Sequence, residues 1–444
     1  MGQWVMALLA GAAAAPADQL AESADSYSVH LEHAELQLGR LSESERSDRV
    51  LQRPGDPPEA WVYGYLPYWA NNLNTVAWDS LTHVAVFDVG VDSNANLTRT
   101  SNWTGTAEKV LRKADKYGVR VHLTLTCFDA QVMEAVLNQP AKRSRLAESV
   151  AELVNDYGGH GVSVDFEGVP YSVKQTLVAF VQELSLLVEE VTVATPAVDW
   201  NSSFDYDELA AASDALFIMG YGYHWKGGDP GPVSPLFGGG VWSKYSLQWS
   251  VEDHMKWGAP ADRILLGLPL YGRSWPSTSK EVPGVATADG EAVVYEVAVP
   301  AADSLGRHYD EQTETPYAFP SSREQLWYDD IESIRAKIAY AIEEDLLGVG
   351  FWALNYDGGD EALWEMVRQE TGAGGVATPD SGQGDTGSWS EGGDSGGPQG
   401  SDKAEEAGCA GCATASGGSS SAGFGLLGLL LVGWSRRRKD SRAG

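Results

Sequence analysis

Cysteine and positive charge are both scarce in this sequence. The 444 residues include only three cysteines, and two of them, Cys409 and Cys412, lie close together near the C-terminal end. A core held together by disulfides is therefore not expected. Lysine and arginine number 31 against 62 aspartates and glutamates, which gives a formal net charge of -31. Because nucleic acids are bound by clustered cations, this balance argues against a nucleic-acid partner.

Signals for a cofactor or a metal are lacking as well. No glycine-rich phosphate-binding loop follows a predicted strand, and Cys127 has no metal-like spacing to another cysteine. His83 and His122 are isolated strand residues, for which we expect a structural role. We therefore expect neither a metal nor an organic cofactor.

Aromatic residues are abundant instead, with 16 tryptophans and 18 tyrosines. Such a surplus can fill a core, or it can form platforms on which the apolar faces of sugar rings stack. Hydrophobic residues make up 43% of the chain, which is enough for one large core. Both uses of the aromatic residues are compatible with this composition.

The composition divides the chain into five segments. Residues 1–17 contain an apolar stretch followed by small residues, which is typical of a secretory signal peptide. A polar leader or spacer spans residues 18–59, and strand and helix patterns alternate over residues 60–371. Residues 372–408 are rich in Gly, Ser and Asp, which predicts a flexible linker. Residues 409–444 hold the cysteine pair, an apolar segment and a basic end.

The order of features in the C-terminal tail resembles the sorting tags of myxobacterial surface proteins. Its apolar run from Phe424 to Trp434 is shorter than the roughly 20 residues of a membrane-spanning helix. The following residues 436–439 read RRRK, and such a cluster stays on the cytoplasmic side. The resemblance implies a removable sorting signal, and the alternative is a plain membrane anchor. Either way, we expect the domain of residues 60–371 to be secreted or held at the cell surface.

Eight apolar runs within residues 60–371 predict a parallel barrel. They are rich in valine, isoleucine and leucine without strict alternation, which is typical of parallel strands covered by helices. Helical periodicities lie between them, so we predict an α/β fold, a (β/α)8 TIM barrel. The predicted strands are Trp61–Leu66, Thr82–Phe87, Val119–Thr126, Gly161–Phe166, Val191–Pro196, Ala215–Met219, Ile264–Leu268 and Gly348–Ala353.

One stretch interrupts this alternation. Residues 275–325 lie between the seventh and eighth predicted strands, and short strands are indicated at residues 293–295 and near Tyr317. We interpret the stretch as an insertion at the top of the barrel that could form one wall of a groove. The alternative is a surface loop without a function.

The fourth predicted strand carries the strongest local signal for chemistry. Successive strand residues point to opposite sides, so Ser163, Asp165 and Glu167 share one face. This face points into the barrel, with Glu167 at the C-terminal rim where the active sites of this fold lie. Repulsion between two neighbouring carboxylates keeps one of them protonated near neutral pH. A protonated Glu167 could then donate its proton to a glycosidic oxygen.

Here the sequence resembles the family 18 glycoside hydrolases, the chitinases and related N-acetylglucosaminidases. Their fourth strand carries the motif Asp-Gly-x-Asp-x-Asp-x-Glu, and residues 160–167 read HGVSVDFE. Asp165 and Glu167 match, whereas His160 and Ser163 replace the first two aspartates. The loss at Ser163 removes the buried partner of Asp165, so an altered pH dependence is expected.

The resemblance extends over residues 60–371 and implies further site residues. Tyr221 matches the tyrosine that holds the substrate acetamido group, while Gly222 replaces the family's aspartate. Trp352 matches the tryptophan beneath the reacting sugar. The remaining residues implied in substrate binding are Tyr65, Trp69, Tyr271 and Arg273.

The resemblance implies a retaining mechanism assisted by the substrate. Glu167 would act as the general acid and then the base, Asp165 would orient the acetamido group, and Tyr221 would hydrogen-bond its oxygen. The expected partner is a polysaccharide that contains β-1,4-linked N-acetylglucosamine, either chitin or peptidoglycan, cut internally or from an end. A monomer is expected. The alternative is a chitinase-like surface protein that binds carbohydrate with weak or no catalysis; a purely structural surface role is a third reading.

Overall fold

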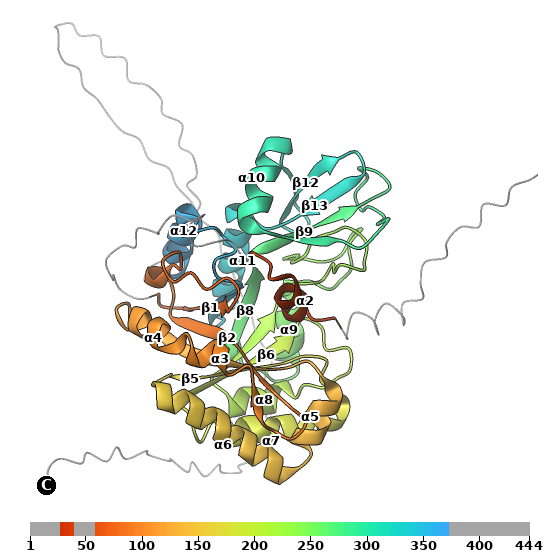
Figure 1. Ribbon diagram of the computed structural model, residues 1–444. Helices are drawn as coiled ribbons and strands as arrows, with labels where there is room; N and C mark the ends of the chain where they lie inside the picture. The colour runs from red at the N-terminus through yellow and green to blue at the C-terminus, as the bar shows by residue number, and fades with distance from the viewer. Residues whose placement is uncertain (1–26, 40–57, 373–444) are drawn as a thin grey trace, which may run out of the picture. The chain divides into compact units, whose positions relative to one another are not determined.

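The predicted strands form a closed parallel barrel (Figure 1). In the computed structural model, which describes residues 27–39 and 58–372, the strand order is β1-β14-β8-β7-β6-β5-β4-β2. Strands β1 and β2 also pair, which closes the sheet, and all these neighbours are parallel. This confirms the TIM barrel. Its strands are β1 (Trp61–Pro67), β2 (His83–Val91), β4 (Arg120–Cys127), β5 (Gly161–Phe166), β6 (Glu190–Pro196), β7 (Ala215–Met219), β8 (Ile264–Pro269) and β14 (Gly348–Trp352).

Helices cover the outside of the barrel, as the periodicity predicts. Helix α6 shows why they form: Pro140 occupies its first turn, and Gly158 ends it in the left-handed conformation, with φ of 74°. The helices of the barrel region are α3 (Ser101–Thr104), α4 (Ala107–Asp115), α5 (Ala130–Leu137), α6 (Pro140–Tyr157), α7 (Lys174–Leu184), α8 (Tyr206–Ala212), α9 (Leu247–Lys256), α11 (Ile331–Glu343) and α12 (Glu361–Thr371). Short 3-10 turns lie at Trp78–Ser80, Tyr171–Val173 and Ala261–Arg263, and β3 (Leu97–Thr98) pairs with β2.

Polar side chains close the amino-terminal end of the barrel. Both His83 and His122 direct their Nε2 atoms to Glu190, at 3.3 and 2.9 Å, and Arg120 pairs with the other oxygen of this carboxylate at 2.6 Å. Both histidines therefore have a hydrogen-bond partner at this end of the barrel. Burial alone would raise the pKa of the Glu190 carboxyl, but the hydrogen bonds from His122, His83 and Arg120 outweigh it and hold the pKa well below its usual value, so Glu190 is ionised.

The insertion between β8 and β14 forms a second sheet. Five antiparallel strands pair in the order β10-β9-β13-β12-β11, and the long helix α10 packs beside them. The sequence predicts strands here, but it does not predict the helix. The elements are β9 (Tyr271–Pro276), β10 (Glu291–Val294), α10 (Tyr295–Leu305), β11 (His308–Asp310), β12 (Thr315–Ser321) and β13 (Glu324–Trp327).

A helix also forms in the segment that we interpret as a polar leader. Helix α2 (Val29–Leu36) begins at Ser28, whose side chain accepts a hydrogen bond from the Leu31 amide. The expected signal peptide, linker and C-terminal tail lie outside the described residues. Among the helices of the described ranges, none has the length and apolar character needed to cross a membrane.

A buried ion pair joins α11 to the residue before its N-cap. Lys337 and Asp329 pair in the core, both almost without exposure, whereas Arg335 on the same helix pairs with Glu370 at 3.1 Å while half exposed. Burial penalises both charges of the core pair, raising the pKa of Asp329 and lowering that of Lys337. Removing one partner therefore leaves an uncompensated charge in the interior.

We expect Lys337→Met to destabilise the fold by about 3–5 kcal/mol. Arg335→Met should cost no more than about 1 kcal/mol, because the exposed pair is screened by water. Urea unfolding of both variants and the unchanged chain measures the difference. If both variants lost the same free energy of unfolding, burial would not be what makes the Lys337 pair important.

Candidate active site

Strand β5 places the two candidate carboxylates at the carboxyl end of the barrel. Asp165 is completely buried, and Glu167 follows the strand, where its amide donates to the carbonyl of Cys127 at 3.0 Å. On the opposite face of β5, Phe166 stacks on Phe180 of α7. The alternation expected from the sequence is therefore present, with acids pointing inward and apolar residues against helices.

Ser163 does not take over the role of the missing aspartate. Its hydroxyl hydrogen-bonds the hydroxyl of Tyr65 at 2.9 Å, one layer below the carboxylates. The Oδ1 atom of Asp165 is buried without a hydrogen-bond partner among the described residues. A buried polar atom of this kind is costly unless a ligand satisfies it.

The aromatic residues implied by the resemblance gather around these acids. Trp352 ends β14, and its ring lies 5.7 Å from Tyr65 and 6.3 Å from Trp69, centroid to centroid. Tyr221, just after β7, faces Tyr271 of β9 at 6.1 Å. Parallel strands end at the same rim, so residues far apart in the sequence meet there.

Helix α2 occupies the centre of this group, which the sequence does not predict. The Nδ1 atom of His30 lies 2.7 Å from Asp165 Oδ2 and 3.1 Å from Glu167 Oε1. The Nε2 atom of the same ring lies 2.7 Å from the Tyr221 hydroxyl. It stacks on Trp352 with ring centroids 3.8 Å apart. All the candidate catalytic residues therefore contact one histidine of the same chain.

Two further side chains of α2 contact the site. Glu32 forms a buried ion pair with Arg273, with 2.6 Å between Oε2 and Nη2. His33 accepts a hydrogen bond from the Trp352 indole at 2.9 Å. A serine cap followed by two histidines one helical turn apart, within the polar segment 18–59, is the weak signal that could have pointed to these contacts.

Burial controls the protonation of the acid. Desolvation raises the pKa of Glu167, the neighbouring Asp165 raises it further, and His30 opposes both. Burial also lowers the pKa of His30, but Asp165 and Glu167 outweigh it and raise the value to about 10. The imidazole is therefore protonated at neutral pH and supplies positive charge between the two acids.

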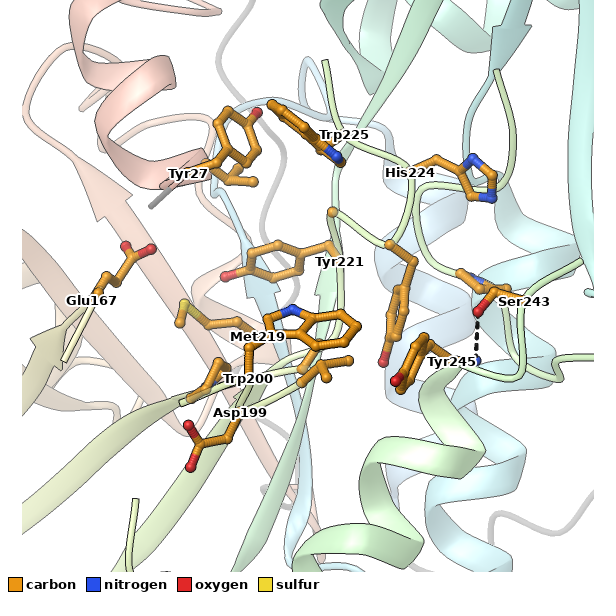
Figure 2. Close-up of a pocket in the computed structure, with 18 of the residues that line it drawn as sticks. Tyr27, Glu167, Asp199, Trp200, Met219, Tyr221, His224, Trp225, Ser243 and Tyr245 are labelled. Atoms are coloured by element: carbon orange, nitrogen blue, oxygen red, sulfur yellow. Dashed lines mark hydrogen bonds between the residues drawn. The ribbon is translucent and has the colours of Figure 1, made fainter. Parts of the chain in front are cut away.

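A cavity of about 590 Å³ extends from Glu167 along one side of α2. Figure 2 shows Glu167 at one edge, Tyr221 and Trp200 in the middle and Tyr245 at the far end. Trp225 and Trp242 also line it. Part of the aromatic surplus therefore lines the site.

Among the described residues, two groups have side chains close enough to share a cation. One is His83, His122 and Glu190 at the opposite end of the barrel, and the other is His30 with Asp165 and Glu167. In both groups the imidazoles already hydrogen-bond the carboxylates. The absence of a metal and a cofactor stays an expectation from the sequence.

The comparison with known proteins agrees with this geometry. Residues 62–357 match the family described as glycosyl hydrolases family 18. The chain belongs to this family. It is 24% identical over 324 residues to the Bacillus subtilis protein named "Putative sporulation-specific glycosylase YdhD", an alignment that covers 69% of this chain and 70% of the relative.

Other family 18 proteins resemble shorter parts of the sequence or share the fold. Mouse chitotriosidase-1 is 26% identical over 267 residues, 52% of this chain and 56% of the relative. The chain therefore spans little more than half the length of that relative. A family 18 chitinase of Cycas revoluta, solved in complex with (GlcNAc)3, superimposes with a TM-score of 0.63 at 21% identity over 69% of this chain and 98% of the other. At this identity the likeness shows the fold.

The raised pKa of His30 predicts a pH-dependent contribution to stability. The imidazole is charged in folded and unfolded chains below its ordinary pKa of 6.5, so its stabilisation is fully present there. This contribution declines as the pH rises through about 10, where the folded chain loses the proton. We expect the difference in free energy of unfolding between the unchanged chain and His30→Gln to shrink from pH 6 to pH 10. A constant difference in urea unfolding across this range would contradict the ion pair.

Proposed function

We propose that this protein hydrolyses β-1,4 linkages of polysaccharides that contain N-acetylglucosamine. The observation that carries this proposal is the space above Trp352. There the planar imidazole of His30 lies between Asp165 on one side and Tyr221 on the other, with Glu167 beside it. An acetamido group presents an N–H and a carbonyl oxygen on opposite sides, as this arrangement requires. Membership of family 18 supports the same reaction class.

The two acids lie close enough to act on one sugar. The nearest oxygens of Asp165 and Glu167 lie within 4.8 Å of each other. Two carboxyl groups at this separation can reach the acetamido group and the glycosidic oxygen of the same residue. In this proposal the substrate's own acetamido oxygen is the nucleophile, and Asp165 stabilises the positive charge that develops.

The reaction then proceeds in two balanced steps. The acetamido oxygen forms a bond to the anomeric carbon as the glycosidic bond breaks, and Glu167 gives its proton to the departing oxygen. Water next attacks the same carbon, Glu167 takes the proton from it, and the cyclic intermediate opens. The raised pKa of Glu167 suits it to begin as the acid.

Other features support the binding of a polymer outside the cytoplasm. Trp200, Trp225 and Trp242 line the cavity next to Glu167 and offer stacking surfaces for further sugar rings. The apolar start and the basic tail of the sequence suggest that the domain acts outside the cell or at its surface. Chitin and peptidoglycan both contain the required sugar.

Glu167→Gln should lower hydrolysis of a fluorogenic N-acetylglucosamine oligomer by about 10²–10⁴-fold, because the amide cannot transfer the proton. The matched control is Glu148→Gln, an exposed carboxyl on α6, which should keep full activity. Release of reducing ends from chitin and from purified peptidoglycan identifies the polymer. If the unchanged chain and the variant Glu32→Gln, which weakens the contact of α2 with Arg273, both bind the oligomer and hydrolyse none of these substrates, a carbohydrate-binding protein is favoured instead.

The stereochemistry provides a separate test of the mechanism. We expect the first product seen by proton NMR to be the β-anomer, since two inversions at the anomeric carbon restore the starting configuration. An oligomer whose reacting sugar lacks the acetamido group should not be cleaved. Initial release of the α-anomer would exclude the substrate-assisted route.

A further inference from the structure

We propose that residues 27–39 form an autoinhibitory plug that competes with the polysaccharide for the catalytic site. The term plug denotes these residues, with α2 at their centre. The inference rests on the proposed function for the identity of the competing ligand. The contacts of the plug with the site do not depend on that identity.

The plug engages the groups that the proposed reaction needs. His30 contacts Asp165 and Tyr221 and covers Trp352, and Ser28 donates a hydrogen bond to Glu167 Oε1 at 2.9 Å. No sugar ring can stack on Trp352 while an imidazole lies 3.8 Å from it. The plug and the substrate therefore exclude each other.

The chemistry of the plug imitates that of the expected substrate. The imidazole is planar, stacks on the indole and presents one nitrogen to Asp165 and the other to Tyr221. Its positive charge lies beside Asp165, where the reaction would develop positive charge at the sugar. The Ser28 hydroxyl lies within hydrogen-bond distance of Glu167, as the glycosidic oxygen would.

Contacts of the residues that follow His30 also hold the plug in place. The ion pair of Glu32 with Arg273 is buried, at 8% and 1% side-chain exposure. The Trp69 indole donates to the Leu38 carbonyl at 2.9 Å. Gly39 passes so close to Tyr356 that an added Cβ would lie 2.9 Å from its ring. The segment is thus fitted to the site over its whole described length.

Gly222, which replaces the family's aspartate, is adapted to this arrangement. It has φ of 78°, which favours glycine, and an added Cβ would already contact Val29 of the plug at 3.4 Å. A longer acidic side chain in this direction would meet α2. Glycine at position 222, where the family motif has aspartate, therefore leaves room for the plug.

Release of the plug need not break the barrel. Tyr27 and Val29 form one wall of the cavity, whose remaining walls include Trp200 and Trp242. A sugar chain can enter this open half of the site first and then displace the plug by mass action. Because the plug is tethered to the barrel through residues 40–57, cutting the chain there would lower its local concentration and raise activity.

The test compares Glu32→Gln with Glu35→Gln in the full chain. Glu32 holds the buried Arg273, whereas Glu35 is exposed on the same helix, so both variants lose the same charge. We expect Glu32→Gln to lower the KM for chitotetraose by at least about tenfold with kcat unchanged, because fewer molecules hold the plug. A synthetic peptide of residues 27–39 should restore the inhibition. Equal KM values in the two variants would overturn the proposal.

Two measurements separate this proposal from the proposed function. Calorimetric binding of chitotetraose should show the same tenfold gain in affinity for Glu32→Gln even if no variant hydrolyses the sugar. Hydrogen exchange needs no ligand, and the amides of residues 31–36 should exchange faster in Glu32→Gln than in Glu35→Gln. If no variant hydrolyses the sugar, the proposed enzymatic function is contradicted but the plug is not. If the amides exchange at the same rate in Glu32→Gln and Glu35→Gln, the plug is contradicted but the proposed function is not. Circular dichroism melting verifies that both variants stay folded.

Discussion

Two neighbouring acids at the end of one strand impose the main constraint on this protein. The two-residue repeat of β5 brings Asp165, which is fully buried, and Glu167 to the same side, where desolvation and the nearby Asp165 both raise the pKa of Glu167. Residues 158–171 contain no lysine or arginine to compensate. The compensating charge comes from His30, which lies 135 positions before Asp165 in the sequence.

The same groups can therefore serve two ligands. A flat group above Trp352 that hydrogen-bonds Asp165 on one side and Tyr221 on the other satisfies the site, whether it belongs to a sugar or to the chain itself. Asp165 Oδ1 and the Tyr271 hydroxyl keep unused hydrogen-bonding capacity among the described residues, even with α2 in place. Under the proposed competition, a substrate that also used these two atoms would make more contacts than the helix does.

The departures from the family motif have separate physical consequences. Ser163 binds the Tyr65 hydroxyl and leaves Asp165 without a second acid beneath it. His30 therefore lies between two acids and not three, and its one positive charge is shared by Asp165 and Glu167. Gly222 removes side-chain bulk beside Val29. Both changes leave Asp165 and Glu167 in position and alter what surrounds them.

The sequence by itself determined the barrel and the residues on its rim, because strand alternation and helical periodicity are local patterns. It placed all eight strands and the acids of β5, but it missed α10, whose internal Pro300 disrupts a helical pattern. Composition left the roles of the tryptophans open. Only the packing of the folded chain places Trp78 and Trp364 in the core, and Trp200 and Trp225 in the wall of the cavity. The occupation of the site by residues 27–39 was decided by tertiary structure alone. Its contacts join positions up to 319 residues apart, and no local pattern encodes which buried acids a short polar helix will meet.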